Sequence, residues 1–242
     1  MTFFQEPRRA RQPFLLAPWP VLLLIGILAA AYAAFAFAPP ALQGRALANF
    51  AFYPARYSAA FIAAHSYNPG TLFERALPFV SYIFMHGSLG HLTINCVWLL
   101  PFGSVVARRF GATAFYVFFL LCGAAGAAGH LAFNWGSTLP VVRASGAISG
   151  LMGASFRMIG NSGQYGGHGG VAPLFSRRIV TWTAVWVGVN VLAGVTGLGA
   201  GTEVRLVAWQ AHLGGYFAGL LLVGPFLTLV DTRLEPPDIR HR

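Results

Sequence analysis

Apolar residues run through this chain in long blocks that no charged residue interrupts. The charge-free blocks cover residues 12–44, 76–107, 110–142, 179–202 and 206–230. A transmembrane helix needs about 20 consecutive, mostly apolar residues, and each block can supply them. The pattern therefore predicts one membrane-spanning helix in each block.

A sixth, shorter segment is expected at residues 144–160. It follows Arg143 and contains Arg157, so hydropathy alone would make it a marginal span. We include it because leaving it out would put both ends of the next segment on the wrong side of the membrane. The predicted fold is therefore an all-α polytopic membrane protein built as a bundle of six transmembrane helices.

The basic residues predict the orientation of this bundle. All 16 are arginine, and with six spans their clusters fall on one side of the membrane. The positive-inside rule makes that side the cytoplasm, so both termini are expected there. The clusters precede the first span, follow the second and precede the fifth: Arg8, Arg9 and Arg11; Arg108 and Arg109; Arg177 and Arg178.

One membrane domain is expected, at residues 17–230, between a cytoplasmic N-terminal segment at 1–16 and a cytoplasmic tail at 231–242. The tail is polar and contains prolines, a composition typical of disorder. The outer loop at about 39–80 mixes aromatic residues and alanines with isolated arginines. We expect this loop to lie in the membrane interface.

The first residues also imitate a secretory signal peptide. The basic stretch RRARQ is followed by an apolar run that ends in AFAFAPP, which resembles an A-x-A cleavage site. The run from Ala17 to Ala38 is longer than the apolar region of a usual signal peptide. We therefore expect it to remain in the protein as the first span.

Composition supports the membrane assignment and removes several functions. Hydrophobic residues make up 56% of the chain and charged residues 9%, as in membrane proteins. The net charge of +10 follows from the orientation signal and from attraction to membrane lipid, so no nucleic-acid partner is expected. Cys96 and Cys122 lie inside apolar blocks and indicate neither a disulfide nor a metal site.

Acidic residues are missing from the apolar blocks. All six Asp and Glu residues lie outside them, which argues against a carboxylate proton relay, an aspartyl dyad and an H-E-x-x-H zinc site. A serine nucleophile would then lack a buried carboxylate to orient its base. A catalytic pair, rather than a triad, is therefore the most that the sequence predicts.

Polar residues inside the spans mark the candidate site, because burying each one costs free energy. His91 and Asn95 are four residues apart in the second span, so they share a helix face. Small residues in the fourth and sixth segments would let a hydroxyl and an imidazole meet between closely packed backbones. They are Ser145, Ser149 and Gly153, with Gly146 and Gly150 beside them, and Gly215 and Gly219 on the face of His212.

With these motifs the chain resembles a bacterial rhomboid, a six-helix intramembrane serine protease. That family combines H-x-x-x-N in the second span, G-x-S-G in the fourth and A-H-x-x-G in the sixth, which here read His91 to Asn95, RASG and AHLGG. The resemblance implies Ser145 as nucleophile, His212 as general base and then acid, and His91 and Asn95 as an oxyanion hole. It also implies that His86 lines a water-containing cavity.

The resemblance further implies transmembrane proteins as substrates, no metal and no cofactor. It places the protein in a bacterial inner membrane. Two departures concern the surroundings of the site. Ser149 stands where many members have an aromatic residue packed on the base, and Leu77 and Pro78 replace a Trp-Arg pair that bears on how the outer loop anchors. His130 and Asn190 are expected to be structural, bonded to neighbouring helices or to backbone.

A third departure bears on activity, because Arg143 replaces the first glycine of G-x-S-G. An arginine there either disturbs the loop that presents Ser145, or faces water at the cavity mouth and steers anionic groups. An inactive rhomboid-like protein that binds membrane helices without cutting them is therefore the alternative. A small transporter or channel is disfavoured because no inverted repeat and no mid-depth charge other than Arg143 is visible.

Overall fold

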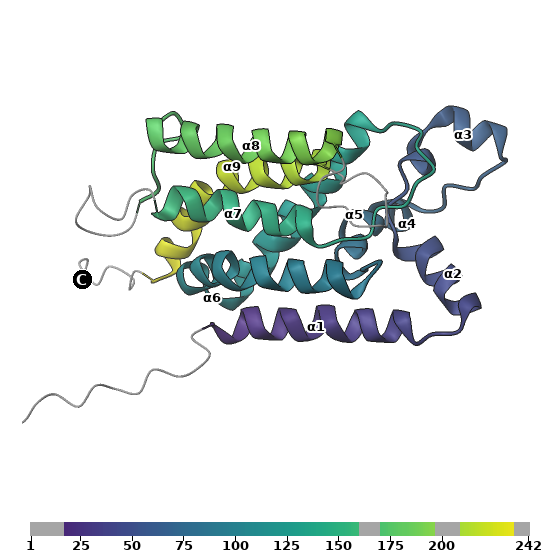
Figure 1. The fold of residues 1–242 in the computed structure, drawn as a ribbon, viewed down its shortest axis with the longest axis horizontal. Coiled ribbons are helices and arrows are strands. Elements are labelled where there is room, and N and C mark those ends of the chain that lie inside the picture. The colour runs from purple at the N-terminus through teal and green to yellow at the C-terminus, as the bar shows by residue number, and fades with distance from the viewer. Residues whose placement is uncertain (1–16, 160–169, 197–208, 235–242) are drawn as a thin grey trace, which may run out of the picture.

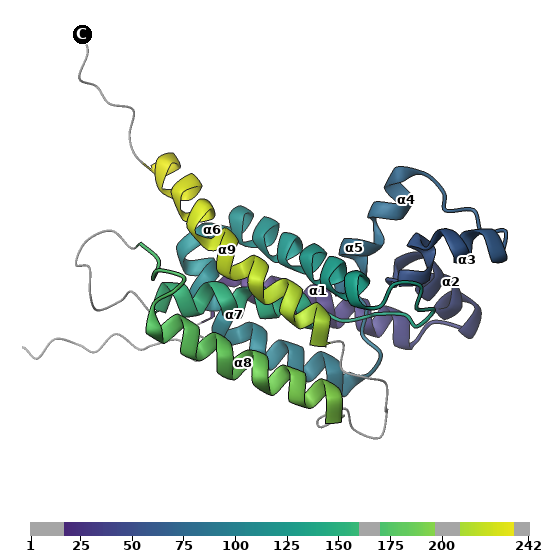
Figure 2. The same ribbon diagram turned by 90° about the horizontal axis from the view of Figure 1, so that it is seen from above.

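The computed structural model describes residues 17–159, 170–196 and 209–234, which are mostly helical. Five long helices pack along one another (Figures 1 and 2): α1 (Trp19–Ala36), α6 (Leu89–Phe133), α7 (Ser145–Ile159), α8 (Arg177–Thr196) and α9 (Trp209–Leu234). Short helices connect α1 to α6 at one end of the bundle: α2 (Pro40–Phe50), η1 (Pro54–Tyr57), α3 (Ala59–Ala64), α4 (Leu72–Ala76), α5 (Pro78–Ser81) and η2 (Tyr82–Phe84).

Helix α6 consists of two segments joined at Gly111. This residue has φ 72° and ψ 176°, angles that an α-helix does not contain and that glycine adopts without strain. The chain reverses direction at Gly111. The evidence is that the Tyr82 hydroxyl donates a hydrogen bond to the Gly123 carbonyl at 2.8 Å. A straight helix, rising about 1.5 Å per residue, would carry Gly123 far out of reach of Tyr82.

Within the described residues, four helices are long and apolar enough to cross a membrane: α1, α6, α8 and α9. Helix α7 is shorter, at 15 residues. It is also the most enclosed, since nearly all of its residues from Gly146 onward are buried between α6 and α9. The all-α membrane architecture predicted from the sequence agrees with this arrangement.

Two glycine pairs allow α7 and α9 to touch backbone to backbone. A Cβ atom at Gly215 would overlap the carbonyl oxygen of Gly146, and one at Gly219 would overlap the carbonyl oxygen of Gly150. Gly150 itself lies against Cys122 of α6. Side chains larger than hydrogen would therefore push the helices apart at these positions.

The predicted small-residue row on α7, formed by Ser145, Ser149 and Gly153, also meets α9. A Cβ atom at Gly153 would lie 2.5 Å from the Tyr216 carbonyl oxygen, and Ser145 contacts α9 through its hydroxyl. The closest backbone contacts are those of Gly146 and Gly150, which the sequence placed beside that row. The Ser149 hydroxyl donates to the Ser145 carbonyl of its own helix at 2.8 Å.

Two helix ends do not coincide with the ends of the charge-free blocks. The third block runs to residue 142, whereas α6 ends at Phe133, close to His130. The chain beyond it is irregular up to α7 and includes a β-bridge between Phe52 and Val141. Helix α9 continues past residue 230 to Leu234. The predicted N-terminal segment at 1–16 and most of the predicted tail, at 235–242, lie outside the described residues.

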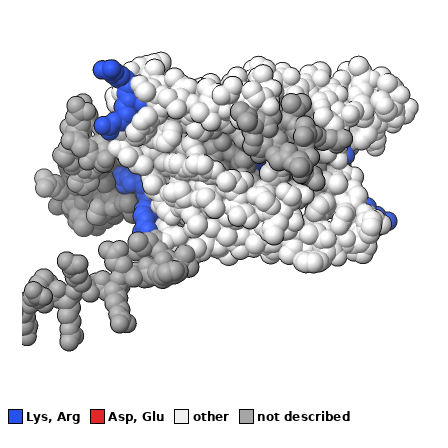
Figure 3. Space-filling view, viewed as in Figure 1, with Lys and Arg blue, Asp and Glu red and all other residues white. Residues whose placement is uncertain are grey.

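Arginine side chains gather at one end of the bundle, where α1 and α8 begin (Figure 3). Arg177 is the first residue of α8, and Arg108 and Arg109 precede the turn at Gly111. The short helices between α1 and α6 lie at the opposite end (Figure 1). The bundle therefore has a strongly basic end and an end formed by the short helices.

The substitution Gly219→Ala should destabilise the protein, because its Cβ atom would overlap the Gly150 carbonyl. We expect a loss of about 1–3 kcal/mol, as for other overpacked cores. The effect is measured by thermal unfolding in detergent, with the reactivity of the buried Cys122 thiol as the signal of unfolding.

The matched control is Gly188→Ala in α8, where an added Cβ atom meets nothing within 4 Å. This variant should unfold at or slightly above the native temperature, since alanine favours helix. Equal unfolding temperatures for the two variants would contradict the close contact between α7 and α9.

Candidate active site

Ser145 is the first residue of α7, at the end of the helix nearer the short helices (Figure 1). The irregular chain before it is fixed to the bundle, because the Arg143 backbone N–H donates to the Tyr82 carbonyl at 3.1 Å. Backbone N–H groups in the first turn of a helix have no partner within the helix, and the helix dipole is positive there. Ser145 therefore lies where developing negative charge would be stabilised.

His212 lies in the first turn of α9 and contacts Ser145 directly. Its Nε2 atom is 2.7 Å from the Ser145 Oγ atom, a normal hydrogen-bond distance. The two residues are 67 positions apart in the sequence. Gly215, one turn after His212, is in backbone contact with Gly146, so the glycine contact and the serine–histidine contact occur side by side.

The other ring nitrogen of His212 contacts Asn190 of α8. The distance from His212 Nδ1 to Asn190 Oδ1 is 2.8 Å, and Asn190 Nδ2 donates to the Trp186 carbonyl at 2.8 Å. As expected from the sequence, Asn190 bonds to a neighbouring helix, and it also bonds to backbone. Its pairing with His212 was not predicted. The available signal was an amide within an otherwise apolar span, which is uncommon without a partner.

His86 and Asn95 form a second polar pair. The Asn95 Nδ2 atom lies 3.0 Å from the His86 Nε2 atom, and both side chains are buried. His91 is partly buried and close enough to His86 to affect it electrostatically, and its backbone N–H donates to the Ser88 hydroxyl at 3.3 Å. The Asn95 side-chain amide, which the sequence predicted for the oxyanion hole, is therefore hydrogen-bonded to His86.

Arg143 places a positive charge among these groups. Its side chain is partly buried, and its Nε atom has no hydrogen-bond partner among the described residues. The guanidinium acts electrostatically on His86, His130 and His212. The arginine at the glycine position of G-x-S-G therefore influences the pocket that contains the serine–histidine contact.

Other polar groups of the spans have structural partners. His130 is buried, and its Nδ1 atom lies 3.3 Å from the Asn134 Nδ2 atom in the same helix. The Ser155 hydroxyl donates to the Phe102 carbonyl at 3.2 Å. Among the described residues, no group of three or more His, Cys, Asp or Glu side chains is placed to hold a metal ion.

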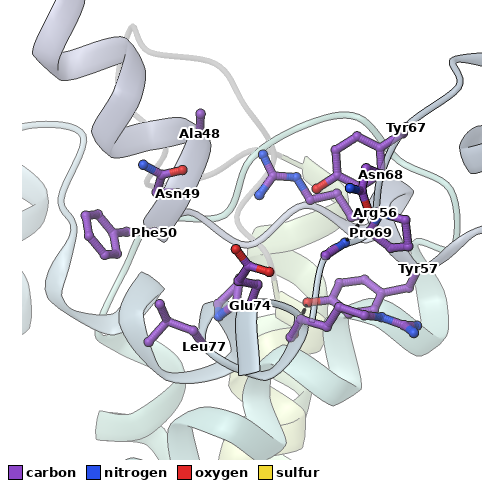
Figure 4. A pocket seen from close by; sticks show the side chains of 13 residues that line it. Ala48, Asn49, Phe50, Arg56, Tyr57, Tyr67, Asn68, Pro69, Glu74 and Leu77 are labelled. Carbon is purple, nitrogen blue, oxygen red and sulfur yellow. Dashed lines mark hydrogen bonds between the residues drawn. The ribbon is translucent and has the colours of Figure 1, made fainter. Parts of the chain in front are cut away.

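A separate hollow of about 540 Å³ lies among the short helices (Figure 4). The Glu74 carboxylate points into it and caps α4 through hydrogen bonds from the Thr71 backbone N–H at 2.7 Å and hydroxyl at 2.9 Å. These bonds lower the pKa of the Glu74 carboxyl. Burial raises the pKa of Tyr57 to about 12, and its hydroxyl donates to the Arg75 carbonyl. The lining of this hollow includes neither Ser145 nor His212.

Comparison with known families accounts for the arrangement of motifs. A family model described as the Rhomboid domain matches residues 74–228, which run from α4 to α9. The chain belongs to the rhomboid family. It is therefore an integral membrane protein of a family of intramembrane serine proteases that act on transmembrane substrates. No curated protein matches the chain.

The geometry of this rhomboid predicts an activated Ser145. A fluorophosphonate probe should label the detergent-purified protein, and Ser145→Ala should abolish the label. His212→Ala should slow labelling on the order of 100-fold, the usual contribution of a general base.

Ser149→Ala is the matched control. Its hydroxyl is one helical turn away and bonds to backbone rather than to His212, so labelling should continue at near the native rate. Label that persists in Ser145→Ala, or that disappears in Ser149→Ala, would assign the nucleophile elsewhere.

Proposed function

We propose that this rhomboid is an active intramembrane endopeptidase that works through Ser145 and His212. The observation that carries the proposal is the 2.7 Å contact between Ser145 Oγ and His212 Nε2. A serine hydroxyl is a weak nucleophile unless an adjacent base accepts its proton. Here the base is within hydrogen-bonding distance without any rearrangement.

The reaction would follow the acyl-enzyme route. His212 Nε2 accepts the hydroxyl proton as Ser145 Oγ bonds to the scissile carbonyl carbon, and the protonated ring then gives that proton to the leaving amide nitrogen. In the second half His212 takes a proton from water, whose oxygen attacks the acyl carbon. The proton returns to Ser145 Oγ as the ester bond breaks. This sequence needs no metal and no cofactor.

The negative charge on the tetrahedral intermediate requires fixed donors. The backbone N–H of Ser145 at the start of α7 would provide one, and the side chains of His91 and Asn95 would provide others. The hydrogen bond between His86 and Asn95 supports this assignment, because it restrains the amide before substrate binds. Donors that are already oriented stabilise charge without reorganisation.

We further infer that residues 17–230 cross the membrane six times, with both termini in the cytoplasm of a bacterial cell and the domain in its inner membrane. Two observations support six crossings: α6 reverses at Gly111, and α7 is enclosed by longer helices. The basic end of the bundle supports the orientation. Ser145 would then lie toward the outer face, so transmembrane substrates would be cut near their outer ends.

The alternative is a rhomboid that binds membrane helices without cleaving them. It is favoured by Arg143, which lies two residues before Ser145 and acts electrostatically on His212. The contact between Ser145 and His212 argues against it, because Arg143 leaves the pair within hydrogen-bonding distance.

Reconstitution with a transmembrane substrate tests the two possibilities. We expect cleavage by the native protein, loss of cleavage in Ser145→Ala and His212→Ala, and activity of Arg143→Gly within about tenfold of native, since a residue outside the reacting groups acts mainly through positioning. If the native protein does not cleave the substrate and Arg143→Gly does, the helix-binding function would replace the protease function as the assignment.

Substrates with a weakened helix should be cut faster. The scissile peptide must leave its helix to reach Ser145, and an interior proline removes about 3 kcal/mol of helix stability. Placing Gly-Pro near the outer end of a uniformly Leu-rich substrate helix should raise kcat/KM by about tenfold or more. Equal cleavage of the two substrates would count against unwinding as a step.

A further inference from the structure

Asn190 is the only residue of α8 that reaches the serine–histidine contact among the residues with a described position. We propose that Asn190 is a positioning residue that holds the His212 ring ready to accept the Ser145 proton, so that the site is a Ser–His–Asn triad rather than a pair. This inference rests on the proposed function of Ser145 and His212. It adds a neutral amide in the place where many serine hydrolases have a carboxylate.

The orientation of the Asn190 amide follows from its second hydrogen bond. A backbone carbonyl can only accept, so the group that faces the Trp186 carbonyl at 2.8 Å must be the NH2 group. The opposite amide atom, which lies 2.8 Å from His212 Nδ1, is then the oxygen. The local bond to Trp186 therefore fixes which end of the amide faces the histidine.

The orientation of the amide determines the tautomer of His212. An oxygen acceptor beside Nδ1 requires the ring to carry a proton on Nδ1. In the neutral ring Nε2 then has a free lone pair, and this atom lies 2.7 Å from the Ser145 hydroxyl. Among the described residues Nδ1 has no other hydrogen-bond partner, so removing the Asn190 oxygen removes the tautomer preference.

Helix α8 also packs on the bundle through aromatic side chains, since Trp186 stacks on Tyr216 of α9 and Trp182 lies against Phe156 of α7. Only Ile179 and Gly194 are buried among its residues. Between the described residues of α8 and α9, side-chain hydrogen bonds run from Asn190 to His212 and from Thr183 to Tyr216, the latter at 2.9 Å. These bonds lie two helical turns apart on α8. The Thr183 bond joins the same two helices away from Ser145 and provides a matched control for simple helix docking.

Three variants separate positioning from docking. Asn190→Leu keeps the side-chain size and removes the acceptor, Asn190→Asp keeps an oxygen acceptor at the same distance, and Thr183→Val removes the control bond. We expect Asn190→Leu to lower kcat on the order of 10- to 100-fold with KM unchanged, the effect of a displaced catalytic group. The rate of fluorophosphonate labelling should fall by the same factor.

Asn190→Asp should recover most of the lost rate, and Thr183→Val should stay within twofold of native. Similar rates for Asn190→Leu and Thr183→Val would show that Asn190 only docks α8, and would overturn the inference. In that case labelling would still be lost in Ser145→Ala, so the proposed function would stand.

A second measurement does not depend on activity. Nitrogen NMR of 15N-histidine-labelled protein, with His212 assigned by comparison with His212→Gln, reports which ring nitrogen carries the proton. The inference requires Nδ1–H in the native protein and in Thr183→Val, and a change of tautomer in Asn190→Leu. Identical tautomers in the native protein and Asn190→Leu would overturn it, including in a protein that proves inactive.

Discussion

The backbone contact between α7 and α9 is the constraint on which the rest of the structure depends. Gly146 and Gly150 of α7 lie against Gly215 and Gly219 of α9 so closely that a Cβ atom would overlap the opposite carbonyl oxygen. In a membrane, helices gain little from hydrophobic exclusion, because lipid is as apolar as the side chains, and close packing of small residues becomes the attraction between them. The same closeness brings the Ser145 hydroxyl to the His212 ring.

The second constraint is the cost of polar groups within an apolar bundle. An unpaired polar group in such surroundings is expensive, and a charged one more so. Two pairs of polar side chains at the site reduce this cost: Asn95 with His86 and Asn190 with His212. An amide can orient an imidazole without adding a buried charge. This gives a physical reason why a site without any acidic residue in its spans can still fix the orientation of its base.

The all-α membrane architecture was predictable from the sequence because the bilayer imposes a simple rule on composition. The reversal at Gly111 was anticipated by Arg108 and Arg109, which interrupt the apolar run. Small residues on α7 marked the side that meets α9, but they did not show that Gly146 and Gly150 make the closest backbone contacts there, since serine and glycine are both small and hydropathy does not distinguish their faces. The partner of Asn190 was not predictable, because it depends on the register of α8 against α9, which no short motif encodes.

Arg143 can be understood in the same electrostatic terms. As the reaction proceeds, positive charge develops on His212 and negative charge on the substrate oxygen near the Ser145 N–H. A fixed guanidinium raises the free energy of the first charge and lowers that of the second, so its two effects oppose each other. The residue that contacts the base is the neutral Asn190, so no carboxylate beside His212 can form an ion pair with Arg143 instead of orienting the ring. The arginine can therefore occupy the glycine position of the motif while Ser145 and His212 keep their hydrogen bond.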